Sequence, residues 1–380
     1  MFSPPKWPRM TDEDLAMMRK ADPALRQGPM YHQFSEAFAA FCDTSGQENP
    51  KEKLYVLPVA NGTVSLELIL KALGIQRGDE VILPAYTFVA TLSSIAYTGA
   101  LPVLADIEPD TYNLSPEDCQ RKITPRTKAI VAVAVAGRPF DLDAMEEIAK
   151  RHHLPLIVDA AQAVGALWQG RSIASYGLCA SFSCQNTKNL TCGEGGIITT
   201  ADGAFYEKLS ALLKEEPGTA LGEVSCALLL SQLRSLPEQM EQRAHASSYL
   251  NHHLKDSRLV QPLFQDPRIT LDACHLYVLR TRYRELAEAG FSRADLIREA
   301  SALGLPLSGG YQPLYDLPSV RSERTTRLVG GQIDLTPLPN CRIASYEEGL
   351  WLEQFWLLAE DRELDEILVV FAQLERRFFG

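Results

Sequence analysis

Three features of the sequence lie where parallel α/β sheets place their ligands, beyond the carboxyl ends of strands. Asp159 follows the apolar run PLIV, and a buried carboxylate is costly there unless it is paired. Lys188 lies among small and apolar residues, where desolvation would lower the pKa of its amine and make it nucleophilic toward carbonyl groups. Asn61-Gly62-Thr63-Val64 opens a predicted helix directly after a strand, and the free N–H groups of such a helix end bind anions.

Each feature also has a purely structural interpretation. Asp159 could be the N-cap of a helix over AAQAVGAL, Lys188 an exposed loop lysine, and Asn61-Gly62-Thr63 an ordinary turn and cap. Together, however, an anion cradle, a carboxylate and an amine are what pyridoxal phosphate (PLP) requires. The carboxylate would keep the pyridine nitrogen protonated, so that the ring can accept the electrons of a carbanion.

The elements that must position these residues alternate regularly after Leu54. Helices are predicted at 61–74, 87–99, 115–123 and 141–153, between strands at 53–60, 79–85, 101–107, 128–137 and 155–161. Strands that are apolar on both faces, separated by helices of this length, predict a parallel sheet with helices on both sides.

After Ala180 the pattern changes. The sequence predicts a strand at 180–184, an edge or antiparallel strand at 194–200, and a long helix over 225–255 that connects two domains. We therefore expect an N-terminal arm at 1–50, a large domain at 51–250 and a small domain at 251–380. The arm is expected to hold helices in TDEDLAMMRKA and YHQFSEAFAAFC, followed by a polar loop at 44–53.

Composition excludes several classes of function. The balance of 37 basic and 48 acidic residues gives a net charge of -11, which opposes nonspecific binding of nucleic acid. Eight cysteines without a C-x-x-C motif indicate reduced thiols in a cytoplasmic protein, with no metal site. The start of the chain has no signal-peptide pattern, and we expect no membrane segment. The uncharged stretch 81–105 contains Pro84, Gly99 and Pro102, which favours strand, helix and strand.

The order N-G-T, P-A-Y-T-F-V-A-T, D-A-A-Q-A and S-F-S-x-x-x-T-K-N-L-T-C-G-E-G-G resembles the DegT/DnrJ/EryC1/StrS aminotransferases over most of the chain. The resemblance implies a fold-type I PLP-dependent transferase and a homodimer. Its large domain would hold a mainly parallel seven-stranded sheet between helices, with a smaller α+β C-terminal domain. The reaction implied is transfer of an amino group from glutamate or glutamine to a keto-sugar, cyclitol or related ketone, in biosynthesis of an aminosugar or natural product.

The resemblance also implies roles for individual residues around the cofactor. Lys188 would hold PLP as a Schiff base and then, once displaced by the amino donor, act as the base that moves the proton. Asp159 would pair with the pyridine nitrogen, Gln162 would lie near the phenolic oxygen, and Phe88 would stack on the ring. Core packing for Phe88 and a helix-face amide for Gln162 are the structural alternatives.

The phosphate and the substrate complete the implied site. Thr63, the backbone N–H of Val64, Gly62 and the hydroxyl of Ser183 match the phosphate cradle, although Ser183 could be merely structural. Candidates for the substrate pocket are three tyrosines that could equally be packed rings: Tyr31, Tyr86 and Tyr311. The segments Q-N-T-K-N-L-T-C-G-E-G-G, A-G-R-P-F-D-L-D and G-Y-Q-P-L-Y favour the cyclitol-type branch over nucleotide-sugar members.

Two departures from the family pattern matter. The family's G-x-N-x-R-M, whose Asn reaches the partner's PLP phosphate, is replaced by a short segment with Gly218 and Ala220 where Asn and Arg would stand. The usual V-H-x-x-G is V-A-V-A-G, with Ala134 and Ala136, which would open space near the cofactor. The first change puts the contact across the dimer in doubt.

Two other functions remain open at this point. One is another PLP reaction on the same fold, although the family's dehydratases have His in place of Lys188. The other is a catalytically silent binding module, against which the set Lys188, Asp159 and Ser183 argues.

Overall fold

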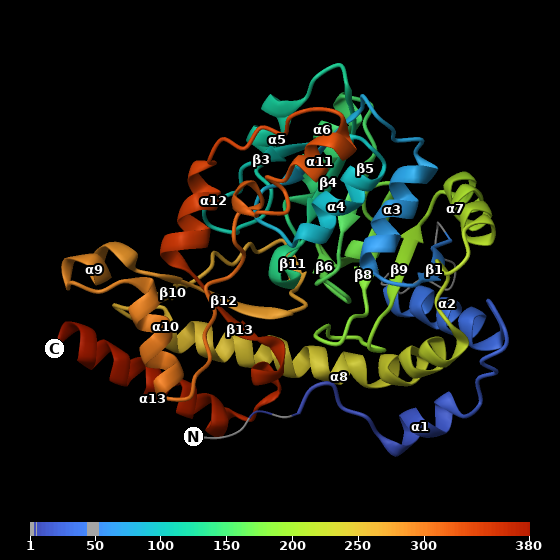
Figure 1. The fold of residues 1–380 in the computed structure, drawn as a ribbon. Helices are drawn as coiled ribbons and strands as arrows, with labels where there is room; N and C mark the ends of the chain where they lie inside the picture. Colours follow the sequence, from blue (N-terminus) through green and yellow to red (C-terminus); the bar gives the residue numbers. More distant parts are fainter. Residues whose placement is uncertain (1–3, 5, 44–52) are drawn as a thin grey trace.

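A seven-stranded sheet forms the centre of the larger part of the molecule in the computed structural model, which describes residues 4, 6–43 and 53–380 (Figure 1). The predicted loop at 44–53 lies outside these residues except for Lys53. The strands stand in the order β1-β9-β8-β5-β4-β2-β3. Their bounds are β1 (Tyr55–Val59), β2 (Glu80–Pro84), β3 (Leu101–Ala105), β4 (Thr127–Val133), β5 (Leu156–Asp159), β8 (Cys179–Ser183) and β9 (Gly196–Thr200).

One strand of this sheet runs against all the others. β9 is antiparallel to both β1 and β8, whereas β8, β5, β4, β2 and β3 pair in parallel. The mainly parallel seven-stranded sheet is therefore confirmed, and so is the antiparallel direction of residues 194–200. The alternative prediction, that residues 194–200 form an edge strand, is wrong. β9 lies between β1 and β8, and β1 is the edge strand.

Alternate residues of the central strands enter two separate hydrophobic cores, one on each face of the sheet. In β4, Ile130 and Ala132 belong to one core, and Val131 and Val133 to the other. This follows from the two-residue period of a strand, and it explains why the strand is apolar throughout. The first core includes α2 (Pro29–Cys42), α5 (Pro116–Lys122), α6 (Leu142–Arg151) and α8 (Glu223–Leu254); the second includes α3 (Gly62–Ala72), α4 (Val89–Tyr97) and α7 (Gly203–Glu215).

The C-terminal part has its own sheet and core. Its strands, in the antiparallel order β10-β12-β13, pack with α10, α13 and the end of α8 around residues such as Leu279 and Phe371. α8 runs along the base of the molecule beneath both parts (Figure 1), so the predicted boundary at residue 250 falls within this helix. The bounds are β10 (Val260–Pro262), β12 (Leu276–Thr281), β13 (Gly349–Glu353), α9 (Tyr283–Glu288), α10 (Arg293–Ala302), α11 (Glu323–Val329), α12 (Pro339–Ile343) and α13 (Asp361–Phe379).

The remaining elements are short. α1 (Asp12–Met18), the first helix predicted in the arm, begins after Thr11 with a capping box and packs with α2 along the first half of α8. β11 (Ile269–Leu271), β6 (Leu167–Trp168) and β7 (Arg171–Ser172) form a small antiparallel sheet.

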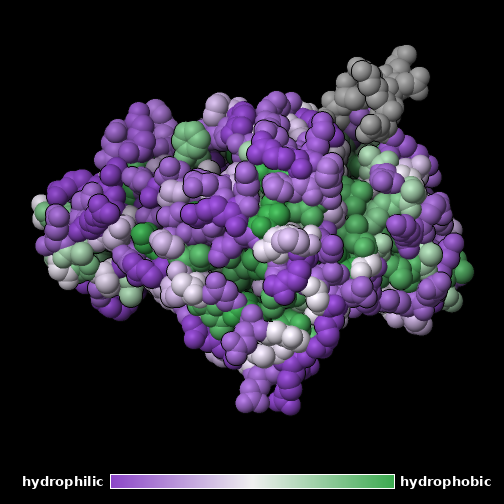
Figure 2. All heavy atoms as spheres, turned by 90° about the horizontal axis from the view of Figure 1, so that it is seen from above, coloured by the Kyte–Doolittle hydropathy of each residue, from purple (hydrophilic) through white to green (hydrophobic). Residues whose placement is uncertain are grey.

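The uncharged stretch 81–105 divides into β2, α4 and β3, as predicted. Of the helices in the described residues, none combines the length and the apolar character that a membrane crossing requires. Seen from above, the surface is mainly hydrophilic, and apolar residues show through near its middle and over one side (Figure 2). All eight cysteines are free thiols, and all except the partly exposed Cys192 are buried.

A buried carboxylate joins the N-terminal arm to α8. Glu223 is 2% exposed, and its two oxygens accept the backbone N–H groups of Met30 and Tyr31 at 3.1 and 2.9 Å. α2 begins after Gly28, which offers no side-chain cap, so Glu223 satisfies N–H groups that the helix itself leaves unpaired. The positive end of the helix dipole also stabilises the carboxylate.

We predict that Glu223→Ala lowers the free energy of unfolding by about 3 kcal/mol, because two buried N–H groups lose a charged acceptor. Denaturant titration of the purified protein measures this. Glu215→Ala, at an exposed position of α7, is the control and should change the same quantity by less than about 0.5 kcal/mol. Equal losses in the two variants would contradict the anchoring role of Glu223.

Candidate active site

A cavity of about 520 Å³ lies at the carboxyl ends of the parallel strands, where the C-terminal part meets the large sheet. It takes residues from the start of α3, the β2–α4 connection, the end of β5, the β8–β9 loop and the strands β12 and β13. The predicted residues among its lining are Gly62, Thr63, Phe88, Asp159, Gln162, Ser183, Lys188 and Tyr311.

Asp159 ends β5 inside this cavity and is 3% exposed. The Thr91 hydroxyl donates to its Oδ2 at 2.9 Å, and the Ala161 N–H donates to its Oδ1 at 3.2 Å. Burial raises the pKa of Asp159, while these hydrogen bonds and the charge of Lys188 act in the opposite direction. Residues 160–166 form turns, so the interpretation of Asp159 as a helix N-cap is wrong, as is that of Gln162 as a helix-face amide.

Lys188 lies in the loop after β8 and is half-buried, which contradicts the interpretation as an exposed loop lysine. Burial lowers the pKa of its amine from 10.5 to about 8, against the charges of Asp159 and Glu353, which raise it. At pH 8 about half of the amine is therefore neutral, compared with about one molecule in three hundred at the ordinary value. A neutral amine is the form that attacks a carbonyl carbon or accepts a proton.

The start of α3 forms the anion-binding end of the cavity. Asn61 is the N-cap, and its Oδ1 accepts the N–H of Val64 at 2.9 Å. That N–H group is therefore occupied, and Val64 does not line the cavity. Gly62 and Thr63 do line it, and a helix start leaves their backbone N–H groups without internal partners.

Two glycines allow this end of the cavity to form. A Cβ atom at Gly62 would lie 3.1 Å from the Cβ of Ser183, and one at Gly196 would lie 2.5 Å from the backbone carbon and oxygen of Asn61. The absence of these side chains lets β9 and the end of β8 approach the first turn of α3. The Ser183 hydroxyl thereby joins the backbone N–H groups at a site suited to a phosphate.

Phe88 and Gln162 also line the cavity. Phe88 precedes α4 and is 59% exposed, so it is not part of the hydrophobic core. A large apolar ring exposed at a cavity suits a planar ligand. Gln162 is fixed at both ends, because its Nε2 donates to the Tyr311 hydroxyl and its Oε1 accepts the Ala136 N–H at 2.6 Å.

The three candidate tyrosines have different environments. Tyr311 lines the cavity directly. Tyr86 is fully buried behind it, with its ring 5.6 Å from that of Tyr311 and 6.1 Å from that of Trp351. Tyr31 is buried in the core between α2 and α8 and does not line the cavity in this single chain.

Lining residues that the sequence did not indicate include Thr91, His275, Trp351 and Glu353. Thr91 had a local signal, because it follows Phe88 by three residues and lies in the first turn of α4, which begins directly after Phe88. His275 is 4% exposed, its Nδ1 lies 3.3 Å from Asn189 Oδ1, and burial holds its pKa well below the usual value. His275, Trp351 and Glu353 come from distant segments and had no local signal.

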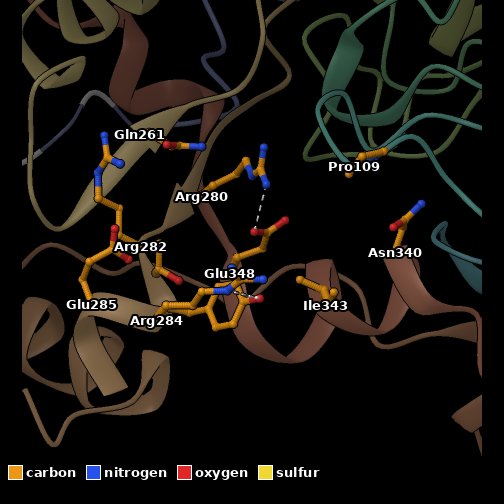
Figure 3. Close-up of a pocket in the computed structure, with 11 residues that line it drawn as sticks. Pro109, Gln261, Arg280, Arg282, Arg284, Glu285, Asn340, Ile343 and Glu348 are labelled. Atoms are coloured by element: carbon orange, nitrogen blue, oxygen red, sulfur yellow. Dashed lines mark hydrogen bonds and ion pairs between the residues drawn. The ribbon is translucent and has the colours of Figure 1, made fainter. Parts of the chain in front are cut away.

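A second hollow of about 410 Å³ lies beside β12 and α12 (Figure 3). Its cationic side chains already have protein partners. Arg280 pairs with Asp110 and Glu348 at 2.7 and 3.2 Å, and Arg282 donates to the Ser257 carbonyl at 2.7 Å. None of the predicted site residues lines it, so the first cavity is the candidate active site.

Comparison with known proteins agrees with this geometry. The sequence model of the DegT/DnrJ/EryC1/StrS aminotransferase family matches residues 8–329. This chain belongs to that family. A relative from Streptomyces griseus named L-glutamine:scyllo-inosose aminotransferase is 33% identical, with 85% of this chain and 81% of the relative covered.

Two further likenesses extend over nearly the full length of the chain. A relative from Micromonospora echinospora, with the provisional name L-glutamine:3-amino-2,3-dideoxy-scyllo-inosose aminotransferase, is 31% identical over 96% of this chain and 92% of its own. The crystal structure of 3-amino-5-hydroxybenzoic acid synthase superimposes with a TM-score of 0.85 at 28% identity, covering 99% of both chains. The predictions of the family, the fold class and a sugar- or cyclitol-type aminotransferase are thereby confirmed.

The two departures from the family pattern now have a structural context. Ala134 and Ala136 are buried in the cores and do not line the cavity, so the expectation that they open space beside the cofactor is wrong. Gly218 has a positive φ of 83°, and Ala220 pairs with Val59 at the sheet edge. In this aminotransferase the shortened segment therefore extends the sheet of its own chain.

We predict that Asp159→Asn lowers the pKa of the Lys188 amine below about 8, because the variant removes the strongest influence that raises it. The pH dependence of acetic anhydride labelling of Lys188, followed by mass spectrometry on cofactor-free enzyme, measures this. Labelling of the exposed Lys150 serves as the reference and should be the same in both proteins. An unchanged or higher midpoint for Lys188 would show that the two groups do not interact.

Proposed function

We propose that this aminotransferase binds PLP on Lys188 and moves the amino group of glutamine to the ketone of a cyclitol. The observation that carries the proposal is the half-buried Lys188 amine, whose pKa is lowered to about 8 and which interacts with the buried Asp159 carboxylate. The names of the relatives from S. griseus and M. echinospora support glutamine as donor and an inosose as acceptor.

The cavity fits PLP in size and in the order of its polar groups. Its volume of about 520 Å³ lies within the usual range for small-ligand sites, which is roughly 300–1,000 Å³. The N–H groups of Gly62 and Thr63 and the Ser183 hydroxyl would hold the phosphate. The other proposed contacts are Phe88 against the ring, Asp159 at the pyridine nitrogen, Gln162 near the phenolic oxygen and Lys188 at the aldehyde.

PLP, when bound, supplies an aldehyde that exchanges amino groups and an electron-poor ring that stabilises negative charge on the adjoining carbon. The residues of the chain do the rest. Asp159 would keep a proton on the ring nitrogen, because a buried carboxylate is stabilised by a cation beside it. Lys188, whose pKa is lowered to about 8, would take a proton at its Nζ from the donor carbon and return it to the neighbouring position.

We also propose a homodimer, located in the cytoplasm, without a membrane or nucleic-acid partner. The family resemblance supports the dimer, and the free thiols are consistent with a reducing compartment. Because the segment around Ala220 pairs with β1 of its own chain, we expect the phosphate to depend mainly on Gly62, Thr63 and Ser183. Contacts from the partner would then contribute less than in family members that keep the Asn.

The alternatives are another PLP reaction and a silent binding module, and a glutamine assay separates them. We predict that PLP-loaded protein is yellow and that glutamine bleaches the visible cofactor band. Colour that no amino donor bleaches would indicate another PLP reaction, and a protein that stays colourless with added PLP would indicate a binding module. Glutamate, tested in parallel, decides the donor.

We predict that Lys188→Ala abolishes turnover with glutamine and scyllo-inosose while PLP still binds noncovalently, because the phosphate contacts remain. Product formation by chromatography and PLP retention by gel filtration measure the two effects. Lys150→Ala, at an exposed position of α6, should behave as the wild type. Turnover retained in Lys188→Ala would remove this residue from the mechanism.

A further inference from the structure

The end of the cavity away from the phosphate cradle is built by the C-terminal part of the chain. Tyr311 and Trp351 line it with ring centroids 4.6 Å apart, and Leu276 and His275 come from the start of β12. This end would face the substrate, because the start of α3 and Ser183 take the phosphate and Lys188 takes the aldehyde. It is largely aromatic and apolar, with one ionisable carboxyl group at its border, Glu353.

Glu353 ends β13 and lines the cavity without a partner of its own. Its backbone pairs with Leu276, but within the described residues its carboxylate accepts no hydrogen bond and forms no ion pair. The side chain is exposed toward the cavity, yet the surrounding protein atoms still desolvate it and raise its pKa. The charge of Lys188 acts on the carboxyl group and lowers that pKa.

The charges around the cavity do not balance once the cofactor is in place. Among the described lining residues there are three carboxylates, from Asp159, Glu194 and Glu353, and one cation, Lys188, with no arginine. His275 is neutral, because burial holds its pKa well below the usual range. Lys188 and Asp159 are both engaged by the cofactor, so Glu353 is left facing the substrate. A partly desolvated carboxylate is stabilised most by a hydrogen-bonded cation.

We propose that Glu353 binds an ammonium group of the acceptor, so that the enzyme prefers a ring ketone that already carries an amine to the same ring with a hydroxyl group. The inference rests on the proposed function and specifies its substrate class. The geometry also explains why a cation belongs here, because Trp351 and Tyr311 next to Glu353 offer aromatic rings that attract ammonium groups. Glu353 thus determines which acceptor is bound, whereas Lys188 carries out the proton transfer.

The first test compares two ketones with PLP-loaded enzyme and glutamine: 3-amino-2,3-dideoxy-scyllo-inosose and scyllo-inosose. In the wild type, kcat/KM should favour the amine-bearing ketone. Glu353→Gln keeps the shape and removes the charge, so kcat/KM should fall about 10- to 100-fold for the amine-bearing ketone and less than about threefold for the other. Glu353→Asp, which keeps the charge on a shorter side chain, should retain part of the preference.

Glu194→Gln is the matched control, because it removes a charge from the same cavity at the β8–β9 loop. Glu194→Gln should change kcat/KM by the same factor for both ketones. The inference is overturned if Glu353→Gln lowers kcat/KM equally for both ketones. It is also overturned if Glu353→Gln slows the bleaching of the cofactor band by glutamine alone, because Glu353 would then act through Lys188. That outcome leaves the proposed function intact.

The second test does not need turnover. Calorimetric titration of the PLP-loaded enzyme with a diaminocyclitol and with myo-inositol measures binding of the two kinds of ring. Glu353→Gln should weaken binding of the diaminocyclitol about tenfold or more and leave that of myo-inositol unchanged. An unaltered preference overturns the inference even if the enzyme transfers amino groups. If glutamine fails to bleach the cofactor, the proposed function fails, and this titration still decides the role of Glu353.

Discussion

The site depends on the interaction of a buried carboxylate, Asp159, with the amine of Lys188. Burial shifts the pKa of the acid upward and that of the amine downward, and each charge opposes the shift of the other. The pair forms because β5 and β8 are parallel neighbours, with Asp159 opposite Ser181, so the loop after β8 begins beside the end of β5. If the two groups were exposed, the lysine would keep its ordinary pKa of about 10.4. Its amine would then be protonated near neutral pH and could not act as a base.

The surrounding structure buries Asp159, covers Lys188 in part and adds the groups that a ligand needs. Glycines at 62 and 196 bring the first turn of α3 against the end of β8, which places helix N–H groups and a hydroxyl at one end of the cavity. The C-terminal part closes the other end, with Trp351 and Glu353 on β13. The cavity lies between these two parts, and α8 runs through both of them. Glu223 at the start of α8 anchors the N-terminal arm.

Much of the fold could be predicted because its signals are local. The alternation of apolar strands with helices is a short-range pattern, and it predicted β2 to β5 with their helices. The predictions failed where packing between distant segments determines the local conformation or the position of a strand. The helix over AAQAVGAL, which was the structural alternative for Asp159, is absent, and turns lead into β6 instead. Gly165, with a φ of 81°, packs there against Met240 of α8. β9 is internal because β1, far away in the sequence, pairs with its free side.

The sequence by itself indicated the residues that we propose to face the cofactor: Lys188, Asp159 and the glycine turn at 62 each follow a recognisable strand in a regular α/β pattern. Tertiary structure alone decided that Tyr31 is packed away from the cavity and that Glu353 lines the end that we propose for the substrate. The reason is physical. Ligand positions at strand ends follow from local periodicity, whereas a side chain that arrives from a separate sheet is placed by packing between distant segments, which leaves no mark in the neighbouring residues.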